Sequence, residues 1–180
     1  MGAELIEGAS LFLPLFLGFV AHGVCIRFGV LRALATPLDH GATWRGRRLF
    51  GENKTFRGIL CVAAGTAVGF ILIGPPPFRG SARGLVLGLA VGAAAMLAEL
   101  PNSALKRQVG VAPGAQVAGA RGAFFHVLDQ VDVVIGGWLV LSLVVAPTPG
   151  RILGSLLFVY CGHQLITLAG YALGMRATPR

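Results

Sequence analysis

The stretch Phe125-His126-Val127-Leu128-Asp129-Gln130-Val131-Asp132-Val133-Val134 places two carboxylates three positions apart at the start of a long apolar segment. Residues separated by three positions share one face of a helix. An Asp at the centre of a membrane helix costs roughly 2.5–3.5 kcal/mol on insertion scales. Two negative charges side by side in such a segment are reasonable when a cation lies between the carboxylates. A divalent metal ion is the obvious candidate.

The composition is that of an integral membrane protein. Of the 180 residues, 55% are hydrophobic and 12% are charged, and the mean hydropathy is +0.77. Too little charge remains to cover a soluble globule. Apolar runs at about 9–28, 59–78, 84–100, 124–146 and 152–174 each approach the ~20 residues that cross a bilayer as a helix. We therefore predict one all-α membrane domain, 1–180, with five transmembrane helices.

The basic residues are distributed unevenly between the segments that connect these spans. Lys and Arg number seven in 27–57, two in 75–83, three in 101–121, one near 151 and two in the tail. The positive-inside rule then predicts an outside N-terminus and a cytoplasmic C-terminus. The connections at about 30–57 and 101–122 become two cytoplasmic loops, long enough to be functional. This pattern explains the net charge of +8 without a nucleic-acid partner.

Small residues recur at four-residue spacing in two of the spans. Gly65 and Gly69 lie in the second span, and Gly84, Gly88 and Gly92 lie in the third. Such rows let helix backbones approach closely. They predict either helix packing within one protomer or a homodimer through the glycine-rich faces.

The predicted topology brings charged residues of both loops to the membrane face where the two aspartates enter. Asn53-Lys54-Thr55-x-Arg57 lies just before the second span, and Lys106-Arg107 follows the third. Free backbone N–H groups and the positive dipole at a helix start favour phosphate binding. Arg binds phosphate bidentately and Lys acts as a point charge. The alternative for basic residues here, and the better one for Arg45, Arg47 and Arg48, is the positive-inside rule or attraction to anionic headgroups.

Asp129 and Asp132 have simpler interpretations as helix caps or as salt-bridge partners of a loop Arg. Mg²⁺, however, typically binds one or two carboxylates together with substrate phosphates and water. Carboxylates, metal and flanking cations together are typical of phosphoryl or nucleotidyl transfer, in which positioning and charge stabilisation supply most of the catalysis.

The motifs at these positions resemble a known family. Ser103-Ala104-Leu105-Lys106-Arg107 followed by Asp129-Gln130-Val131-Asp132 is similar to the C-terminal signature of CTP-dependent phosphatidate cytidylyltransferases (CDP-diacylglycerol synthases), with Gln130 in place of the signature's Arg. A larger set of motifs resembles the shorter, five-span CDP-archaeol synthase branch. That set is Pro37-Leu38-Asp39, Arg47-Arg48-Leu49-Phe50-Gly51-x-Asn53-Lys54-Thr55-x-Arg57-Gly58, Glu99-Leu100-x-x-Ser103-x-x-Lys106-Arg107, Leu128-Asp129-Gln130-Val131-Asp132 and Tyr171-x-Leu173-Gly174-x-Arg176-x-x-Pro179.

Together with the converging charges, the resemblance implies a cytidylyltransferase in the cell membrane whose active site faces the cytoplasm. It would transfer CMP from CTP to a lipid phosphate, such as an isoprenoid ether-lipid phosphate, and release diphosphate. Mg²⁺ would be the cofactor. The expected catalytic residues are Lys54, Lys106, Asp129 and Asp132; the substrate-binding residues are Asn53, Thr55, Arg57, Ser103 and Arg107; and the metal ligands are Asp129, Asp132 and Glu99.

Three other functions remain open at this point. A polyprenol or phytol kinase that uses CTP would need similar groups. A small ion transporter would use the buried Asp pair as an ion site, and a non-enzymatic membrane assembly protein would not depend on the aspartates. Product analysis separates the first, because a kinase yields a lipid phosphate and CDP.

Overall fold

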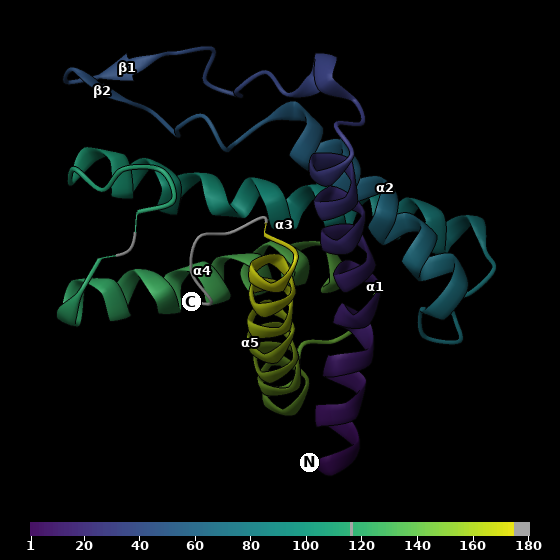
Figure 1. The fold of residues 1–180 in the computed structure, drawn as a ribbon. Coiled ribbons are helices and arrows are strands. Elements are labelled where there is room, and N and C mark those ends of the chain that lie inside the picture. Colours follow the sequence, from purple (N-terminus) through teal and green to yellow (C-terminus); the bar gives the residue numbers. More distant parts are fainter. Residues whose placement is uncertain (116, 175–180) are drawn as a thin grey trace.

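The structure, a computed structural model, describes residues 1–115 and 117–174, and within these ranges it contains five long helices. Each has the length and hydropathy of a membrane span, so the predicted all-α membrane fold with five spans is confirmed. Arg176 and Pro179 of the tail motif lie outside the described residues. The helices are α1 (Gly2–Arg27), α2 (Phe56–Ile73), α3 (Ala82–Gln108), α4 (Gly119–Leu141) and α5 (Pro149–Ala172) (Figure 1).

Hydroxyl side chains mark the start of three helices. Thr55, Ser81 and Thr148 each accept a hydrogen bond from the backbone N–H three residues later, at 3.2, 3.1 and 3.3 Å. Such caps satisfy N–H groups that have no partner within the helix. Pro149 occupies the first position of α5, where its missing N–H removes no helical hydrogen bond.

Helix α3 is longer than the predicted span 84–100. It continues through Pro101 to Gln108, so the prediction of a cytoplasmic loop over 101–122 was wrong at its start and its end. Pro usually ends a helix because it removes a hydrogen bond and crowds the preceding turn, but membrane helices tolerate it when neighbouring groups satisfy the freed backbone. Ser103 and Lys106 therefore lie on a helix, and only 109–118 connects α3 to α4.

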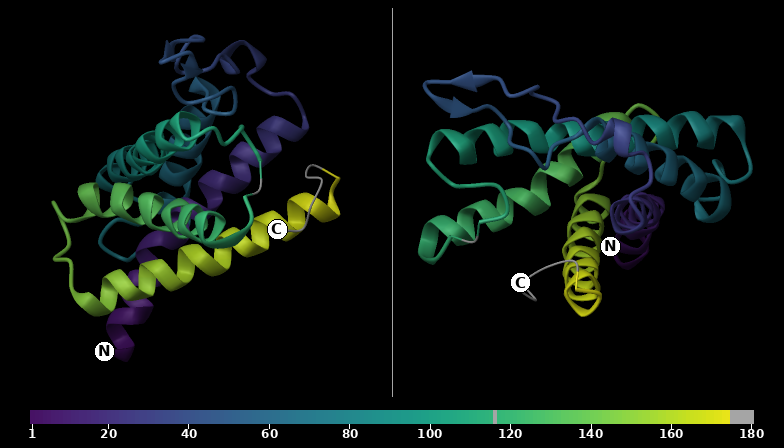
Figure 2. Two further views of the ribbon diagram at one scale, coloured as in Figure 1. Left: turned by 90° about the vertical axis from the view of Figure 1, so that its left-hand side faces the viewer. Right: turned by 45° about the horizontal axis from the view of Figure 1, so that its top comes forward.

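The helices pack in the order α5, α1, α2, α3, α4. Helix α1 contacts both α5 and α2, and α3 contacts both α2 and α4. The pair α3 and α4 crosses the pair α1 and α5 at a steep angle (Figures 1 and 2). The core between them is aliphatic and aromatic, with Phe12, Leu15, Phe70, Val91 and Leu141 among its least exposed side chains.

The glycine rows lie between helices of the same chain. A Cβ atom at Gly88 would be 2.5 Å from the Cα of Ala67 on α2, and one at Gly69 would be 2.6 Å from the carbonyl oxygen of Pro14 on α1. The interpretation as packing within one protomer is confirmed for these positions. Because α1, α2 and α3 already cover them, these faces are not free for a second copy.

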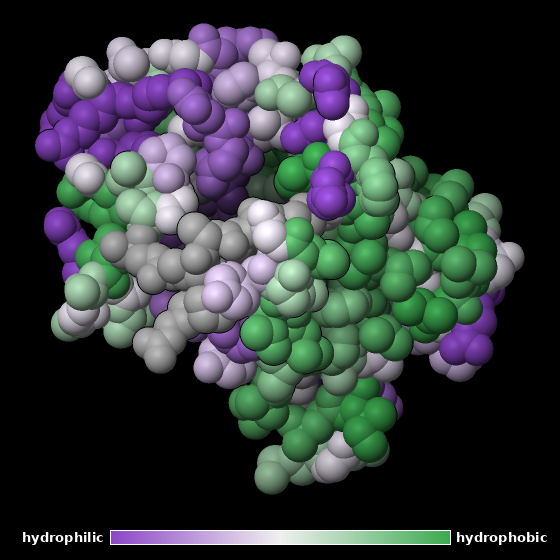
Figure 3. All heavy atoms as spheres, viewed as in Figure 1, coloured by the Kyte–Doolittle hydropathy of each residue, from purple (hydrophilic) through white to green (hydrophobic). Residues whose placement is uncertain are grey.

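The outward faces of the helices are apolar. Val86, Leu139 and Leu165 are each more than 60% exposed, as expected of side chains that contact lipid. In Figure 3 the hydrophobic surface covers most of the helices, whereas hydrophilic residues gather where the first loop lies above the end of α3. The surface is hollowed where these two regions meet.

The first loop, between α1 and α2, contains a 3₁₀ turn, η1 (Arg32–Leu34), and an antiparallel hairpin of two short strands, β1 (Thr43–Trp44) and β2 (Arg47–Arg48). Arg45 and Gly46 form its turn with φ angles of 53° and 75°, as a two-residue hairpin turn of type I′ requires. This loop carries the residues that approach the polar end of α3.

Candidate active site

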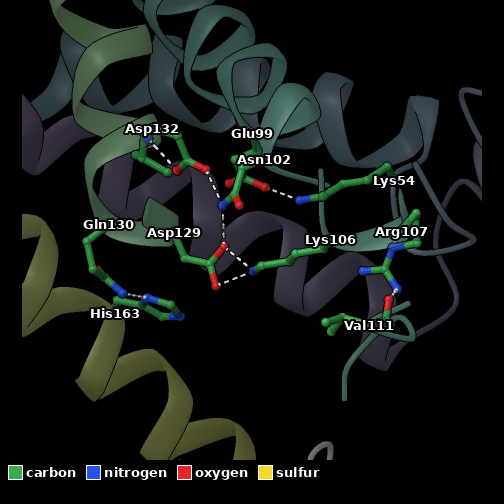
Figure 4. A network of polar contacts seen from close by, with 11 residues as sticks. Lys54, Glu99, Asn102, Lys106, Arg107, Val111, Asp129, Gln130, Asp132 and His163 are labelled. Atoms are coloured by element: carbon green, nitrogen blue, oxygen red, sulfur yellow. Dashed lines mark hydrogen bonds and ion pairs between the residues drawn. The ribbon is translucent and has the colours of Figure 1, made fainter. Parts of the chain in front are cut away.

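The two aspartates of α4 point at one side chain of α3. Asn102 donates through Nδ2 to Oδ1 of Asp129 at 2.7 Å and to Oδ2 of Asp132 at 3.0 Å (Figure 4). Asn102 and Asp132 are buried, at 8% and 9% exposure. The prediction that both carboxylates share one helix face is confirmed, and the amide supplies a donor to the buried Asp132 and one to the partly exposed Asp129.

Each lysine of the cluster is paired with a carboxylate. Lys106 donates from Nζ to both oxygens of Asp129, at 2.5 and 2.7 Å. Lys54, from the first loop, forms an ion pair with Glu99 of α3. These are the only two lysines of the chain, since the other basic residues are all arginine. The structure therefore brings Lys54, Glu99, Lys106 and the aspartates together, although they lie up to 78 residues apart in the sequence.

A short bridge and a helix cap hold the motif at the start of α2 that the sequence predicts to bind an anion. Thr55 pairs with Pro37 in an isolated β-bridge, and its hydroxyl accepts from the Gly58 N–H. The contacts of Thr55 are therefore those of a helix cap. Asn53 is exposed in the preceding turn, and Arg57 is half-buried in the first turn of α2 with no partner for its buried Nε. Asn53 and Arg57 thus remain candidates for substrate binding.

Asp39 organises the loop that carries this motif. Its carboxylate accepts from Arg48 at 2.5 Å and from the backbone N–H groups of Gly41, Phe50 and Gly51 at 3.0–3.1 Å. Burial alone would raise the pKa of Asp39, but these hydrogen bonds outweigh it and hold the pKa well below the usual range. Asp39 is therefore ionised, and it fixes residues 39–51 beside Asn53 and Lys54.

The arginines near the site mostly support the backbone. Arg107 is buried and donates to the carbonyl of Val111 at 2.5 Å, which ties the end of α3 to the following loop. Arg47 donates to the carbonyl of Gln108 at 2.5 Å and fastens the hairpin to α3. Ser103 is buried on the same turn of α3 as Asn102. Arg107 was expected to bind substrate, and its contacts in the structure are with the protein backbone.

Sequence reasoning missed one member of the cluster and one polar contact between α4 and α5. Because the predicted third span ended at residue 100, just before Pro101, Asn102 was not assigned to a helix. In the continuous helix it shares a face with Glu99 and Lys106. Gln130 contacts His163 of α5 through Nε2 and Nδ1. The sequence signal for this contact was His163, a histidine in an apolar span, because such a polar group usually faces the interior of the helix bundle.

The residues of the cluster fit a hard divalent cation. The carboxylates and the side-chain amide provide oxygen atoms, the ligands that Mg²⁺ prefers, and the buried Oδ1 of Asn102 has no hydrogen-bond partner. Glu99 is tied to Lys54 rather than to the aspartates. Within residues 1–115 and 117–174, no three His, Cys, Asp or Glu side chains form a group that could hold a metal. A metal would therefore rely on Asp129, Asp132 and further oxygen donors.

Five helices with the length and hydropathy of membrane spans, and a cluster of carboxylates and lysines where α3 meets the first loop, define a polytopic membrane protein with a polar site. A family model described as CarS-like, CDP-archaeol synthase, matches residues 10–179. The chain belongs to this family, as its motifs predicted.

Individual relatives agree with this assignment. A CDP-archaeol synthase of Methanopyrus kandleri is 34% identical over 98% of this chain and 94% of its own length. One of Halobacterium salinarum is 33% identical, covering 83% of this chain and 86% of the relative. A solved structure described as an intramembrane enzyme for archaeal membrane lipids biosynthesis superposes with a TM-score of 0.68 at 24% identity, over 90% of this chain and 93% of the other, and shares its fold.

Proposed function

We propose that this protein transfers the CMP group of CTP to a lipid phosphate and releases diphosphate. The observation that carries the proposal is the partly buried cluster of Asp129 and Asp132 with Asn102 and Lys106 at the end of α3, beside the loop that precedes α2. Membership of the CDP-archaeol synthase family supports this reaction and an isoprenoid ether-lipid phosphate as acceptor.

The chain's own groups suffice to position the reactants. Lys54 and Lys106 are mobile point charges that can leave their carboxylates and bind phosphate oxygens. Arg57 extends this positive region to the start of α2, where the positive end of the helix dipole favours a phosphate, and Asn53 adds an uncharged amide beside it. A lipid phosphate oxygen is already an anion, so the attack on the α-phosphorus needs no side-chain nucleophile.

Mg²⁺ held by Asp129 and Asp132 would neutralise charge on the phosphates as diphosphate leaves. The proposed location is the cell membrane with the site facing the cytoplasm, which the positive-inside rule and the cytoplasmic source of CTP support. A homodimer through the glycine rows gains no support, since Gly69 and Gly88 pack against helices of the same chain.

The test uses purified protein in lipid nanodiscs with Mg²⁺ and CTP labelled with ³²P at either the α- or the γ-phosphate. We expect α-label in the lipid and γ-label in diphosphate, whereas γ-label in the lipid and α-label in CDP would indicate a kinase. Unsaturated isoprenoid ether and diacyl lipid phosphates are offered in parallel. Asp129→Asn with Asp132→Asn should abolish transfer, whereas Glu7→Gln, which alters an ion pair with Arg151 far from the site, should not.

A further inference from the structure

We propose that Asn102 is a third protein ligand of the metal, bound through its side-chain oxygen after the amide turns over. This inference rests on the proposed function, because it assumes that Asp129 and Asp132 bind a divalent cation. The amide lies between the two carboxylates and donates one N–H to each of them, at 2.7 and 3.0 Å. It therefore lies next to the position that a cation shared by both carboxylates would take.

The two ends of this amide are satisfied unequally. Both aspartates accept from Nδ2, while Oδ1 is buried and has no hydrogen-bond partner. Without a cation, the NH₂ group must face the carboxylates, because an oxygen there would be repelled. A cation between the carboxylates reverses this preference, since it attracts the oxygen and repels the NH₂ group.

The distances suit this exchange. With Mg–O distances of about 2.0–2.1 Å, neighbouring oxygens of an octahedral Mg²⁺ site are separated by about 2.9 Å. Nδ2 is 2.7 and 3.0 Å from its two carboxylate oxygens. A rotation about χ2 exchanges O and N of an Asn without moving the backbone, and that torsion has a broad, roughly two-fold profile. Oδ1 in the present place of Nδ2 would thus lie at a ligand-to-ligand distance from one oxygen of each carboxylate.

The exchange also links the metal to the nucleotide. Lys106, displaced from Asp129 by the metal, becomes free to bind phosphate oxygens of the nucleotide. The remaining coordination positions belong to water and substrate oxygens, as is usual for Mg²⁺.

The test replaces Asn102 with a ligand that reports its own coordination. Asn102→Cys is made after Cys25, Cys61 and Cys161 are changed to Ala, and the full-length protein in detergent is titrated with Cd²⁺. We expect an ultraviolet thiolate-to-cadmium charge-transfer band that saturates with one equivalent. Ala104→Cys in the same background is the control, because Ala104 lines a separate cavity beneath the hairpin. It should give no saturable band.

Mn²⁺ binding, followed by electron paramagnetic resonance, separates failure of the inference from failure of the proposed function. The Cys-free parent should bind Mn²⁺, and the double variant Asp129→Asn with Asp132→Asn should not; absence of binding by the parent would overturn both ideas. Binding by the parent, with no charge-transfer band for Asn102→Cys above the Ala104→Cys level, would overturn only the ligand role. If Asn102→Cys does not fold, Asn102→His is used, and the ¹⁴N modulation of a directly bonded ring nitrogen on Mn²⁺ decides the question.

Discussion

Replacing Lys106 with Met should make the site bind a metal more tightly when nucleotide is absent. In the structure the Lys106 ammonium holds both oxygens of Asp129, at 2.5 and 2.7 Å, so a metal must displace it. Met keeps the length and the apolar stem of the side chain but removes the charge. A lysine that served only to bind triphosphate would leave the metal affinity of the nucleotide-free protein unchanged.

The size of the expected change in metal affinity follows from how exposed the ion pair of Lys106 and Asp129 is. The Lys106 side chain is 16% exposed and that of Asp129 is 39% exposed. Protected hydrogen bonds to charged groups contribute about 1.5–3 kcal/mol, whereas exposed ion pairs contribute about 0.2–1 kcal/mol. Because one partner is substantially solvated, we take a value between them of about 1–1.4 kcal/mol, which corresponds to about a 5- to 10-fold lower Kd.

The assay is Mn²⁺ titration of purified protein at constant pH and ionic strength, followed by electron paramagnetic resonance. Lys106→Arg preserves the charge and should remain within about 2-fold of the unmodified protein, since the cation still competes. Arg79→Met is the control for loss of a distant charge, because Arg79 donates to the Gly74 carbonyl between α2 and α3. An unchanged or weaker Mn²⁺ affinity in Lys106→Met would refute the exchange of lysine for metal.

Three further predictions concern the parts that position the site. Because hydrogen bonds hold the pKa of Asp39 below its usual value of about 3.9, the loop keeps its stabilisation above that pH and loses it only as the pH falls further. Asp39→Asn should remove it at neutral pH and raise hydrogen–deuterium exchange at the Gly51 amide by at least about 10-fold; equal exchange would contradict the anchor role. Gly92→Leu should destabilise the protein by about 3 kcal/mol or more, because its Cβ would lie 2.7 Å from the backbone of α2, and thermal unfolding against Gly2→Leu, which meets open space, measures this. Trp138→Phe should cost about 1–2 kcal/mol by removing the buried 3.0 Å bond to Ser155 that joins α4 to α5, and a melting temperature equal to that of the unmodified protein would refute it.

The fold was predictable because lipid imposes a strong constraint on sequence. Five apolar runs separated by charged or Pro-rich segments leave few alternatives to five helices, and hydroxyl residues such as Ser81 mark where helices begin. The end of α3 was not predictable by the same reasoning. Pro101 is normally read as a helix end, and only the packing of α3 against α4 shows that the helix continues.

That boundary also limited the prediction of the site. The aspartate pair could be found because a charge inside an apolar span is costly unless it serves a purpose, and both lysines could be found because they lie in cationic motifs next to the spans. Asn102 is uncharged and stood just after the supposed helix end, so nothing in the sequence placed it between the carboxylates. The contact between Gln130 and His163 joins different helices, and a single sequence does not report such pairs.

The arginines and the lysines of the chain differ in the contacts that they make: the arginine contacts are fixed, and the lysine contacts can be exchanged. Arginines hold particular partners: Arg48 on Asp39, Arg47 on Gln108, Arg107 on Val111 and Arg151 on Glu7. A planar guanidinium suits such directional bonds, whereas an ammonium on a flexible stem can change partner without losing geometry. Both lysines of the chain lie in the cluster, each on a carboxylate. A site that must keep its carboxylates neutralised when empty, and then release cations to an arriving triphosphate, needs the second kind of residue, and the chain uses lysine only there.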